Sequence, residues 1–419
     1  MEYSKQNILI VGKGGVSSAL AKKLSKADNV DKVYVAPGGC TGENVYSSVD
    51  IREDDLTGLL KFVLENDIGL TVPVSEQALK ADIVSFFQTN GQRVFGPVKS
   101  ACNIAVNKVL GKKFLYKIHA QTSKFGIFDK LQMAEDYLKN SNFPVTIKCS
   151  ETNSLGDRLV CPTVTLAREF LDCLFSKGET GVLIEDYTFG HNFTVYYVTD
   201  GYSALPLNTV ADYKFSGDGD SGILTSGMGC FVPDYKVSQV VISRVENIIK
   251  NTLASLHKKG TPYIGILGLD CTLTGEDKFY VNEFKPFLQD FDASAVLNSV
   301  DDDLVKIFNA CIEGLFADEY EQILSNTAAS VSALVLSKFE NKQIYGLELI
   351  DNIEDIDFTD VNKNQSGMYL TKGSTAFVLT RKALTLARAK NNLYEDLAGI
   401  SFDGMNYRKD IGACILSDF

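Results

Sequence analysis

Two acidic residues in one short stretch of the chain could hold a metal ion. Asp270 ends an apolar run, and Glu283 lies in a second β-prone run after a polar turn. If the turn is a two-residue loop of Gly275 and Glu276, the stretch is a β-hairpin in which Asp270 lies opposite Val281. Side chains alternate along a strand, so the two carboxylates then share one face, a diagonal apart. Such a pair is typical of a Mg²⁺ site that contacts phosphate oxygens, although a solvated surface hairpin has the same pattern.

Lysines near two predicted strands could supply positive charge for those phosphates. Lys148 ends one predicted strand, and a second predicted strand at 182–185 runs into Asp186 and Tyr187. This arrangement suits an adenine nucleotide, because the lysine meets phosphate while the connecting backbone meets the adenine edge. A basic amphipathic helix predicted over 100–118 carries further lysines, most of which we expect on a solvated face.

A glycine turn near the N-terminus could approach an anion. A buried-strand pattern leads into Gly12, Gly14 and Gly15, and a helical pattern follows. Backbone N–H groups at the start of a helix bind anions readily. The last glycine of a dinucleotide-binding fingerprint would fall at Ser17, and no acid ends the second predicted strand. The pattern therefore favours a phosphate-binding or purely structural turn over NAD binding.

A second glycine-rich segment covers residues 212–233. It has little helical or strand periodicity, yet it contains Ile223, Leu224 and Met228, which are typical of a buried segment. We therefore predict an ordered functional loop rather than a flexible linker.

Length and composition limit the functional classes. The 419 residues allow two or three domains, and the formal net charge of −12 argues against nucleic acid as a partner. No apolar run approaches the ~20 residues of a membrane span, and the N-terminus lacks the layout of a signal peptide. The nine cysteines are scattered and form no C-x-x-C pair, and the three histidines lie far apart in the sequence. These features argue against disulfide, thiolate-metal and histidine-based sites, and they favour a reduced cytoplasm.

The order of helical and strand patterns indicates the architecture. The first ~100 residues alternate between strand and helix, which predicts an open, mainly parallel α/β domain. From about Ala329 the pattern becomes strand-rich, which predicts a small α+β domain. Helical patterns cover residues 54–66, 76–89, 164–175, 236–259, 301–323 and 381–398.

Six stretches match one known family in the same order along the chain. They are NILIVGKGG, KVYVAPGG, VFGPVKSA, VLIEDYTFG, GDGDSGILTSGMG and FDGMNYRKDIG. The chain thereby resembles the phosphoribosylamine–glycine ligase (glycinamide ribonucleotide synthetase) family of the ATP-grasp superfamily. The resemblance implies an α/β fold of ATP-grasp architecture. We expect an N-terminal domain over 1–100, an ATP-grasp domain over 101–325 whose lobe around 122–188 covers ATP, and a C-terminal domain over 326–419.

The resemblance also implies an ATP-dependent carboxylate–amine ligase of purine biosynthesis. In such enzymes ATP phosphorylates a carboxylate, and an amine attacks the acyl phosphate; here the substrates would be glycine and phosphoribosylamine, with ATP and Mg²⁺. The reaction needs no nucleophilic side chain, because the protein supplies positioning and positive charge. We expect a cytoplasmic monomer or dimer that acts on small molecules and binds neither nucleic acid nor membrane.

Particular residues take roles through this resemblance and through the hairpin. The residues expected to bind ATP are Lys108, Lys148, Glu185, Asp186, Tyr187 and Asn192. The residues expected to bind substrate are Gly14, Gly15, Ser17, Lys214, Asp218, Gly227, Met228 and Gly229. The residues expected to act in catalysis are Lys148, Asp270 and Glu283, of which Asp270 and Glu283 would also bind Mg²⁺.

The sequence departs from the family pattern at several of these places. Lys285 stands where the family has an asparagine metal ligand, so its ammonium could sit where a metal ion would. Phe287 replaces an arginine that binds an anion, and the segment 154–158 replaces a glycine-rich flap over the ATP phosphates. Three alternatives therefore stay open: a working ligase with a divergent site, a paralogue that joins a different acid and amine, and a catalytically impaired relative that binds a nucleotide.

Overall fold

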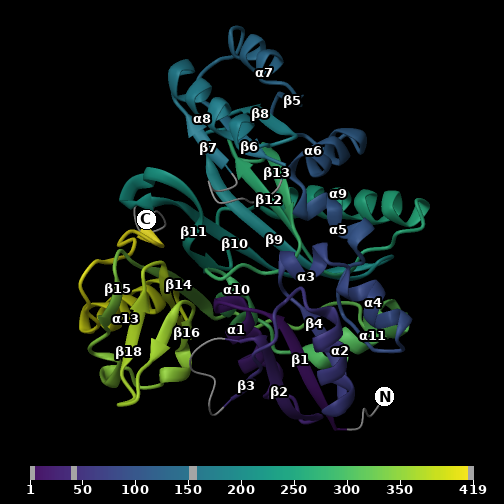
Figure 1. The fold of residues 1–419 in the computed structure, drawn as a ribbon, viewed down its shortest axis with the longest axis vertical. Helices are drawn as coiled ribbons and strands as arrows, with labels where there is room; N and C mark the ends of the chain where they lie inside the picture. The colour runs from purple at the N-terminus through teal and green to yellow at the C-terminus, as the bar shows by residue number, and fades with distance from the viewer. Residues whose placement is uncertain (1–4, 39–44, 151–157, 414–419) are drawn as a thin grey trace.

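The structure is a computed structural model that describes residues 5–38, 45–150 and 158–413. Its strands form a parallel sheet near the N-terminus, an antiparallel sheet in the lobe at the opposite end, and a long sheet between them (Figure 1). A small three-stranded sheet lies in the C-terminal part. The elements that carry the candidate site come from the lobe and the long sheet.

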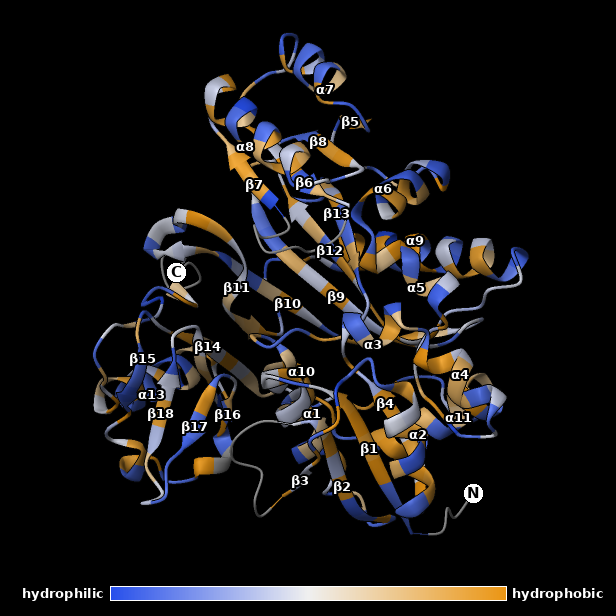
Figure 2. Ribbon diagram, in the orientation of Figure 1, coloured by the Kyte–Doolittle hydropathy of each residue, from blue (hydrophilic) through white to orange (hydrophobic). Residues whose placement is uncertain are grey.

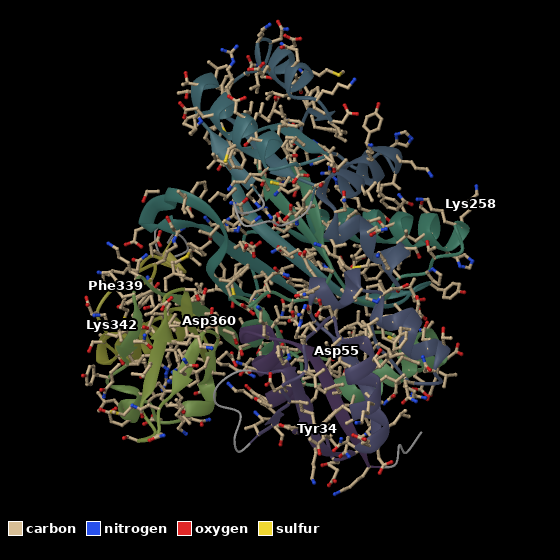
Figure 3. The ribbon with its side chains drawn as sticks, viewed as in Figure 1. Tyr34, Asp55, Lys258, Phe339, Lys342 and Asp360 are labelled. Atoms are coloured by element: carbon tan, nitrogen blue, oxygen red, sulfur yellow. The ribbon has the colours of Figure 1, made fainter. Side chains whose placement is uncertain are left out.

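The N-terminal domain is a parallel sheet covered by helices, as the alternating pattern predicts. The sheet order is β3-β2-β1-β4, and β1 is hydrophobic along its length (Figure 2). Asp55 caps the helix that follows it by accepting from Gly58 N (Figure 3). The helix predicted over 76–89 is in fact two helices, because Asp82 between them takes a left-handed conformation. The elements are β1 (Gln6–Gly12), α1 (Gly15–Leu24), β2 (Val30–Pro37), β3 (Ser47–Ser48), α2 (Leu56–Glu65), β4 (Ile68–Pro73), α3 (Glu76–Lys80) and α4 (Ile83–Thr89).

The helix predicted over 100–118 is also two helices, and the break between them positions Lys108, a residue of the candidate site. The first part is α5 (Lys99–Val106) and the second is α6 (Lys108–Lys117). Asn107 between them has an extended backbone, and its side chain caps α6 by accepting from Leu110 N at 2.9 Å. The break places Lys108 at the first position of α6, where its N–H donates to the carbonyl of Ser150.

The lobe is an antiparallel four-stranded sheet of order β5-β8-β6-β7 packed on two helices. Thr163 caps its second helix by accepting from Leu166 N. The lobe lies at the far end of the molecule from the N-terminal sheet (Figure 1). Its elements are β5 (Phe125–Phe128), α7 (Leu131–Leu138), β6 (Val145–Cys149), β7 (Arg158–Cys161), α8 (Val164–Ser176) and β8 (Val182–Asp186).

The long sheet joins the centre of the molecule to the C-terminal strands. Its order is β13-β12-β9-β10-β11-β14-β19-β16, with β20 paired to β14. The pairing of β11 with β14 means that the sheet continues across the boundary expected near residue 325. The central elements are β9 (His191–Asp200), β10 (Ala204–Gly217), β11 (Ser221–Val232), α9 (Gln239–Lys258), β12 (Ile264–Leu273), β13 (Phe279–Lys285), α10 (Ala293–Ser299), α11 (Leu304–Glu313) and α12 (Phe316–Glu319).

The prediction of a loop over 212–233 is wrong, because this segment is the β-hairpin of β10 and β11. Its glycines hid the strand pattern, and two of them are explained by packing. A Cβ at Gly227 would collide with the ring of Phe291, and one at Gly229 would collide with the carbonyl of Ser332. Glycine is therefore required for close approach rather than for loop flexibility.

The C-terminal part packs its own helix on the end of the long sheet. The hydrophobic core of this C-terminal part includes Phe377, Leu379 and Leu393. In the part of the chain that the structure describes, no helix is both long and apolar enough to span a membrane. The C-terminal elements are β14 (Ala329–Ser337), β15 (Glu340–Gln343), β16 (Ile356–Phe358), β17 (Val361–Lys363), β18 (Tyr369–Lys372), β19 (Thr375–Ala383), α13 (Leu386–Gly399) and β20 (Met405–Asn406).

Arg408 fastens the tip of the β10–β11 hairpin to the C-terminal segment. Its guanidinium is 1% exposed and makes a bidentate ion pair with Asp410 at 2.8 and 2.6 Å. The same guanidinium donates to Asp220 at 2.7 Å and to the carbonyl of Phe215. Asp218, a predicted substrate residue, accepts from the backbone N–H of Lys409 and so takes part in the contact between the hairpin tip and the C-terminal segment.

We predict that Arg408→Met lowers the free energy of unfolding by about 2 kcal/mol, because hydrogen bonds to two carboxylates and a carbonyl are lost. Arg408→Lys should recover only part of the loss, since an ammonium cannot make the bidentate pair. Chemical denaturation measures both. The exposed neighbour Lys409 is the control, and Lys409→Met should leave stability within about 0.5 kcal/mol of the parent.

Candidate functional site

The acidic hairpin exists, but its register differs from the predicted one. Asp270 on β12 pairs directly with Glu283 on β13, and Cys271 pairs with Val281. The prediction that Asp270 faces Val281 is wrong for two reasons. The turn is one residue longer than assumed, since Leu273 pairs with Phe279, and Asn282 is an extra residue in a β-bulge. Directly opposed residues still share a face, so the two carboxylates are nearer neighbours than the sequence predicts.

Glu283 lies among three cations that come from three different elements. Arg158 of β7 donates to its Oε1 at 2.9 Å, Lys108 of α6 lies 3.5 Å from Oε1, and Lys148 of β6 lies 3.4 Å from Oε2. Burial alone would raise the pKa of Glu283, but Arg158, Lys108 and Lys148 outweigh it and hold that pKa well below its usual range. One carboxylate against three cations leaves a net positive charge, which suits the phosphates of a nucleotide.

Lys148 also contacts a second buried carboxylate. Its Nζ lies 2.6 Å from Glu185 of β8, and Lys112 of α6 contacts the same carboxylate at 2.7 Å. Burial opposes the charged form, but these two lysines lower the pKa of Glu185 to about 2. Glu185 therefore orients lysines through its side chain. Lys112 has a 1% exposed side chain, so it lies on the inner face of a helix whose lysines were mostly expected in solvent.

The backbone N–H groups of Asp186 and Tyr187, at the end of β8, donate to carbonyl groups within the lobe. Asp186 N donates to Lys124 O at 2.9 Å, and Tyr187 N donates to Pro144 O at 3.2 Å. Asn192 on β9 accepts from the hydroxyl of Thr272. An adenine base bound here would have to form hydrogen bonds with groups other than these two N–H donors.

A cavity of about 50 Å³ brings most of the predicted nucleotide residues together. This volume is far below the roughly 300–1,000 Å³ of small-molecule sites, so the described conformation is closed. Arg158 from the lobe and Leu224 from the β10–β11 hairpin both line it. The predicted residues that line it are Lys148, Glu185, Asp186, Tyr187, Asn192 and Lys214.

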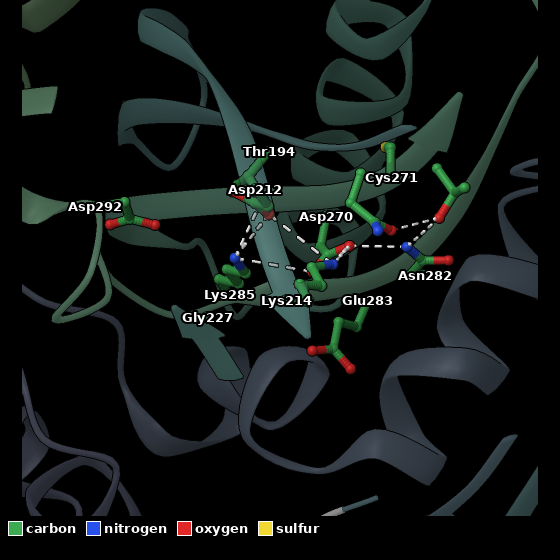
Figure 4. Close-up of polar contacts among 12 residues, drawn as sticks. Thr194, Asp212, Lys214, Gly227, Asp270, Cys271, Asn282, Glu283, Lys285 and Asp292 are labelled. Carbon is green, nitrogen blue, oxygen red and sulfur yellow. Dashed lines mark hydrogen bonds and ion pairs between the residues drawn. The ribbon is translucent and has the colours of Figure 1, made fainter. Parts of the chain in front are cut away.

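Asp270 is held separately from Glu283, by a buried group of charges (Figure 4). Lys214 of β10 donates to both of its oxygens at 2.6 Å, and Asn282 donates to Oδ1 at 2.8 Å. Lys285 lies 3.8 Å from Asp270 and 3.4 Å from Asp212 of β10. Lys214, a predicted substrate residue, is therefore the ion-pair partner of a predicted metal ligand.

A larger cleft of about 890 Å³ lies beside the glycine turn before α1. It is lined by Gly14, Gly227 and Met228 from the predicted substrate group, and also by Phe287 and Asp290. The cleft gathers residues of the N-terminal domain, the β10–β11 hairpin and the segment after β13.

The remaining residues of the predicted substrate group lie outside the cleft lining. Ser17 is 2% exposed, and its buried hydroxyl has no hydrogen-bond partner among the described residues. Gly15 packs against the backbone of Asp290, and Gly229 packs against the backbone of Ser332. The first turn of α1 is not open to an anion, because the carboxylate of Asp290 accepts from Val16 N at 2.9 Å. Burial raises the pKa of Asp290 to about 6.

Asp292 is a second buried carboxylate close to the cleft. It accepts from the hydroxyl of Tyr196 at 2.7 Å and from Gln289 N at 2.8 Å. Burial raises the pKa of Asp292 to about 7, although Lys285 partly opposes this effect. The carboxyl group therefore keeps its proton to a higher pH than an ordinary aspartate does.

Sequence reasoning missed several residues that the fold brings to the site. Asn282 could have been found, since it directly precedes Glu283 in the same strand. Of the others, Asp290 and Asp292 follow the hairpin closely, whereas the remaining three come from elements distant in the sequence from Glu283. The full set of these others is Lys112, Arg158, Asp212, Asp290 and Asp292.

The raised pKa of Asp292 predicts a slope in stability with pH. Between about pH 4 and pH 7 the folded state binds this proton more tightly than the unfolded state. Its contribution to the free energy of unfolding therefore falls as the pH rises, by up to about 1.4 kcal/mol per pH unit. We predict that Asp292→Asn, which keeps both hydrogen bonds possible, flattens this slope in denaturation curves taken from pH 4.5 to 8. An unchanged slope would contradict the assignment.

Comparison with known proteins agrees with this geometry. Residues 6–105 match the model of the phosphoribosylglycinamide synthetase N domain, and residues 106–293 match that of its ATP-grasp (A) domain. The phosphoribosylamine–glycine ligase of Clostridium acetobutylicum is 29% identical over 414 residues, which cover 97% of this chain and 99% of that protein. That of Halalkalibacterium halodurans is 29% identical and covers 98% of both chains.

Solved structures show the same architecture. The crystal structure of phosphoribosylamine–glycine ligase from Thermotoga maritima has a TM-score of 0.81 at 22% identity, and the match covers 97% of this chain and all of that one. A biotin carboxylase from Campylobacter jejuni, solved with a β,γ-ATP ligand, matches with a TM-score of 0.69 at 12% identity. The two family domains, matched in order along a chain that is similar over its full length, lead to one conclusion: the chain belongs to the phosphoribosylamine–glycine ligase family and has the ATP-grasp fold.

Proposed function

We propose that this protein joins glycine to phosphoribosylamine at the cost of ATP, a step of purine biosynthesis. The observation that carries the proposal is the convergence of Lys108, Lys148 and Arg158 on Glu283, next to a cleft large enough for two small substrates. The full-length similarity to ligases of this activity supports the choice of substrates. We place the reaction in the cytoplasm, where free thiols such as those of Cys149 and Cys271 stay reduced.

We expect the two chemical steps of the reaction to occur at different places in the two cavities. A glycine carboxylate oxygen attacks the γ-phosphorus of ATP, the bond to ADP breaks, and an acyl phosphate forms. The amine nitrogen of phosphoribosylamine then attacks the acyl carbon, loses a proton, and expels phosphate. The first step would occur where the nucleotide cavity meets the cleft, and the second within the cleft.

The residues of this chain act by placing positive charge where it is needed. Lys148, Lys108 and Arg158 would offset the charge that spreads over the oxygens of the transferring phosphoryl group. Glu283 and Glu185 fix the orientations of these cations before substrate arrives, so little reorganisation is needed during the reaction. The lobe would have to move outward to admit ATP, because Arg158 closes the 50 Å³ cavity by its ion pair with Glu283.

The hairpin does not fit a metal ion that bridges Asp270 and Glu283. Lys214 engages both oxygens of Asp270, and three cations engage Glu283. Among the residues that the structure describes, no cluster of three or more His, Cys, Asp or Glu side chains could hold a metal. We therefore assign no step to a resident metal, and the Mg²⁺ that accompanies ATP enters as part of the nucleotide substrate.

Two observations favour a second candidate, a ligase for a different acid and amine. Phe287 lines the cleft where the family pattern has an anion-binding arginine, and Asp290 occupies the amides at the start of α1. Both features reduce the capacity of the cleft to bind a phosphate group.

One assay separates these possibilities. The protein is incubated with MgATP, glycine and freshly generated phosphoribosylamine, and release of ADP is measured. ADP release that requires both glycine and the amine supports the proposal. Release only with another acid and amine supports the second candidate. Binding of ATP in calorimetry without turnover of any pair indicates a catalytically impaired relative.

We predict that Glu283→Gln lowers turnover by about 10²-fold, because the three cations lose the carboxylate that holds them in place. Steady-state kinetics of ADP release measures the change. Glu276→Gln, in the exposed turn of the same hairpin, is the matched control and should keep parental turnover. Parental turnover in Glu283→Gln would show that this carboxylate has no part in the chemistry.

A further inference from the structure

Four buried charges, one of which is the hairpin carboxylate Asp270, form a compact group. The group consists of Asp212 and Lys214 on β10, Asp270 on β12 and Lys285 on β13 (Figure 4). The carboxylates are 0% and 1% exposed, and both lysine side chains are 7% exposed. We name these four residues the charge quartet.

The charge quartet is electrically balanced and nearly saturated at Asp270. Lys214 lies 2.6 Å from each oxygen of Asp270, and Asn282 adds a third donor. Two carboxylates face two ammonium groups, so the sum of the charges is zero. A divalent ion added beside Asp270 would bury two uncompensated positive charges unless an ammonium group left.

The groups that surround the Lys285 ammonium favour a positive charge at that position. Its Nζ donates to Thr194 Oγ1 at 3.1 Å and lies 3.4 Å from Asp212. The rings of Tyr196 and Phe291 lie 5.9 and 5.2 Å from the same nitrogen, within the range of cation–π attraction. Asp292 adds a third carboxylate that acts on this ammonium. Lys285 thus has carboxylates, a hydroxyl and two aromatic faces around it.

Glu283 contrasts with the charge quartet. It faces three cations and therefore lies in a region of excess positive charge, where an anion is favoured. The hairpin thus has a neutral side at Asp270 and a positive side at Glu283. A phosphate chain with its own metal ion fits the positive side and has no counterpart at the neutral one.

We propose that the ammonium groups of Lys214 and Lys285 fill the cation position beside Asp270, so that Asp270 binds no divalent metal ion. The only divalent ion at this hairpin is then the one that arrives with the nucleotide. This second statement rests on the proposed function, whereas the first concerns the protein alone. The protein therefore works with one divalent ion per nucleotide site.

The test counts bound Mn²⁺ from the loss of the free-ion signal in electron paramagnetic resonance. Without nucleotide, the parent protein should bind no Mn²⁺ with a Kd below about 1 mM. With a non-hydrolysable ATP analogue it should bind one ion per chain, and Asp270→Asn should leave that number at one. Two ions per chain in the parent, or loss of an ion in Asp270→Asn, would overturn the proposal.

A second variant tests the role of the ammonium directly. Lys285→Asn leaves Asp212 and Asp270 with one lysine between them and supplies an amide oxygen, so it should gain one Mn²⁺ site in the absence of nucleotide. Lys278→Asn, at an exposed position of the same hairpin, is the matched control and should gain none. A folded Lys285→Asn protein, judged by circular dichroism, that binds no Mn²⁺ would contradict the proposal.

These experiments also distinguish a failure of the proposed function from a failure of the proposal about Lys214 and Lys285. If calorimetry detects no binding of the ATP analogue, the proposed function fails. The comparison of the parent protein with Lys285→Asn in Mn²⁺ alone still decides whether Lys285 fills a cation position.

Discussion

The ion pairs of Lys148 hold the two halves of the candidate site together. This side chain is 5% exposed and lies 2.6 Å from Glu185 in the lobe and 3.4 Å from Glu283 in the long sheet. Loss of both carboxylates would leave a buried ammonium group without a partner, which commonly costs 3–5 kcal/mol. The ion pairs of Lys148 and Arg158 with Glu283 thus join the lobe to the hairpin. A triphosphate could compete for the same cations, so this interaction links lobe position to nucleotide binding.

The long sheet explains how remote parts of the chain meet at one cleft. The pairing of β11 with β14 carries the sheet from the nucleotide side into the C-terminal part, and Arg408 secures the β10–β11 hairpin from the other end. On the N-terminal side, Asp290 joins the segment after β13 to the first turn of α1. These connections position Gly14, Gly227 and Phe287 around a single volume.

The differences from the family pattern fall on two distinct parts of the site. Lys285 belongs to the neutral charge quartet and affects how cations are held. Phe287 and Asp290 belong to the cleft and affect what the second substrate may be. The three cations around Glu283 keep the charge that phosphoryl transfer requires. The departures at Lys285 and at Phe287 thus lie in different parts of the site.

The sequence by itself determined the class of the fold, the order of its parts and most of the charged residues near the nucleotide cavity. Strand and helix periodicity, glycine turns and a carboxylate-bearing hairpin are local features, so Lys148, Glu185 and Glu283 could be singled out from the chain alone. The tertiary structure decided the register of the hairpin, because a bulge at Asn282 depends on neighbouring strands. It also decided that Lys112 and Arg158 reach buried carboxylates and that Asp290 occupies the glycine turn. Charge pairing between elements distant in the sequence leaves no periodic signal, and burial determines which lysines become ion-pair partners and which remain in solvent.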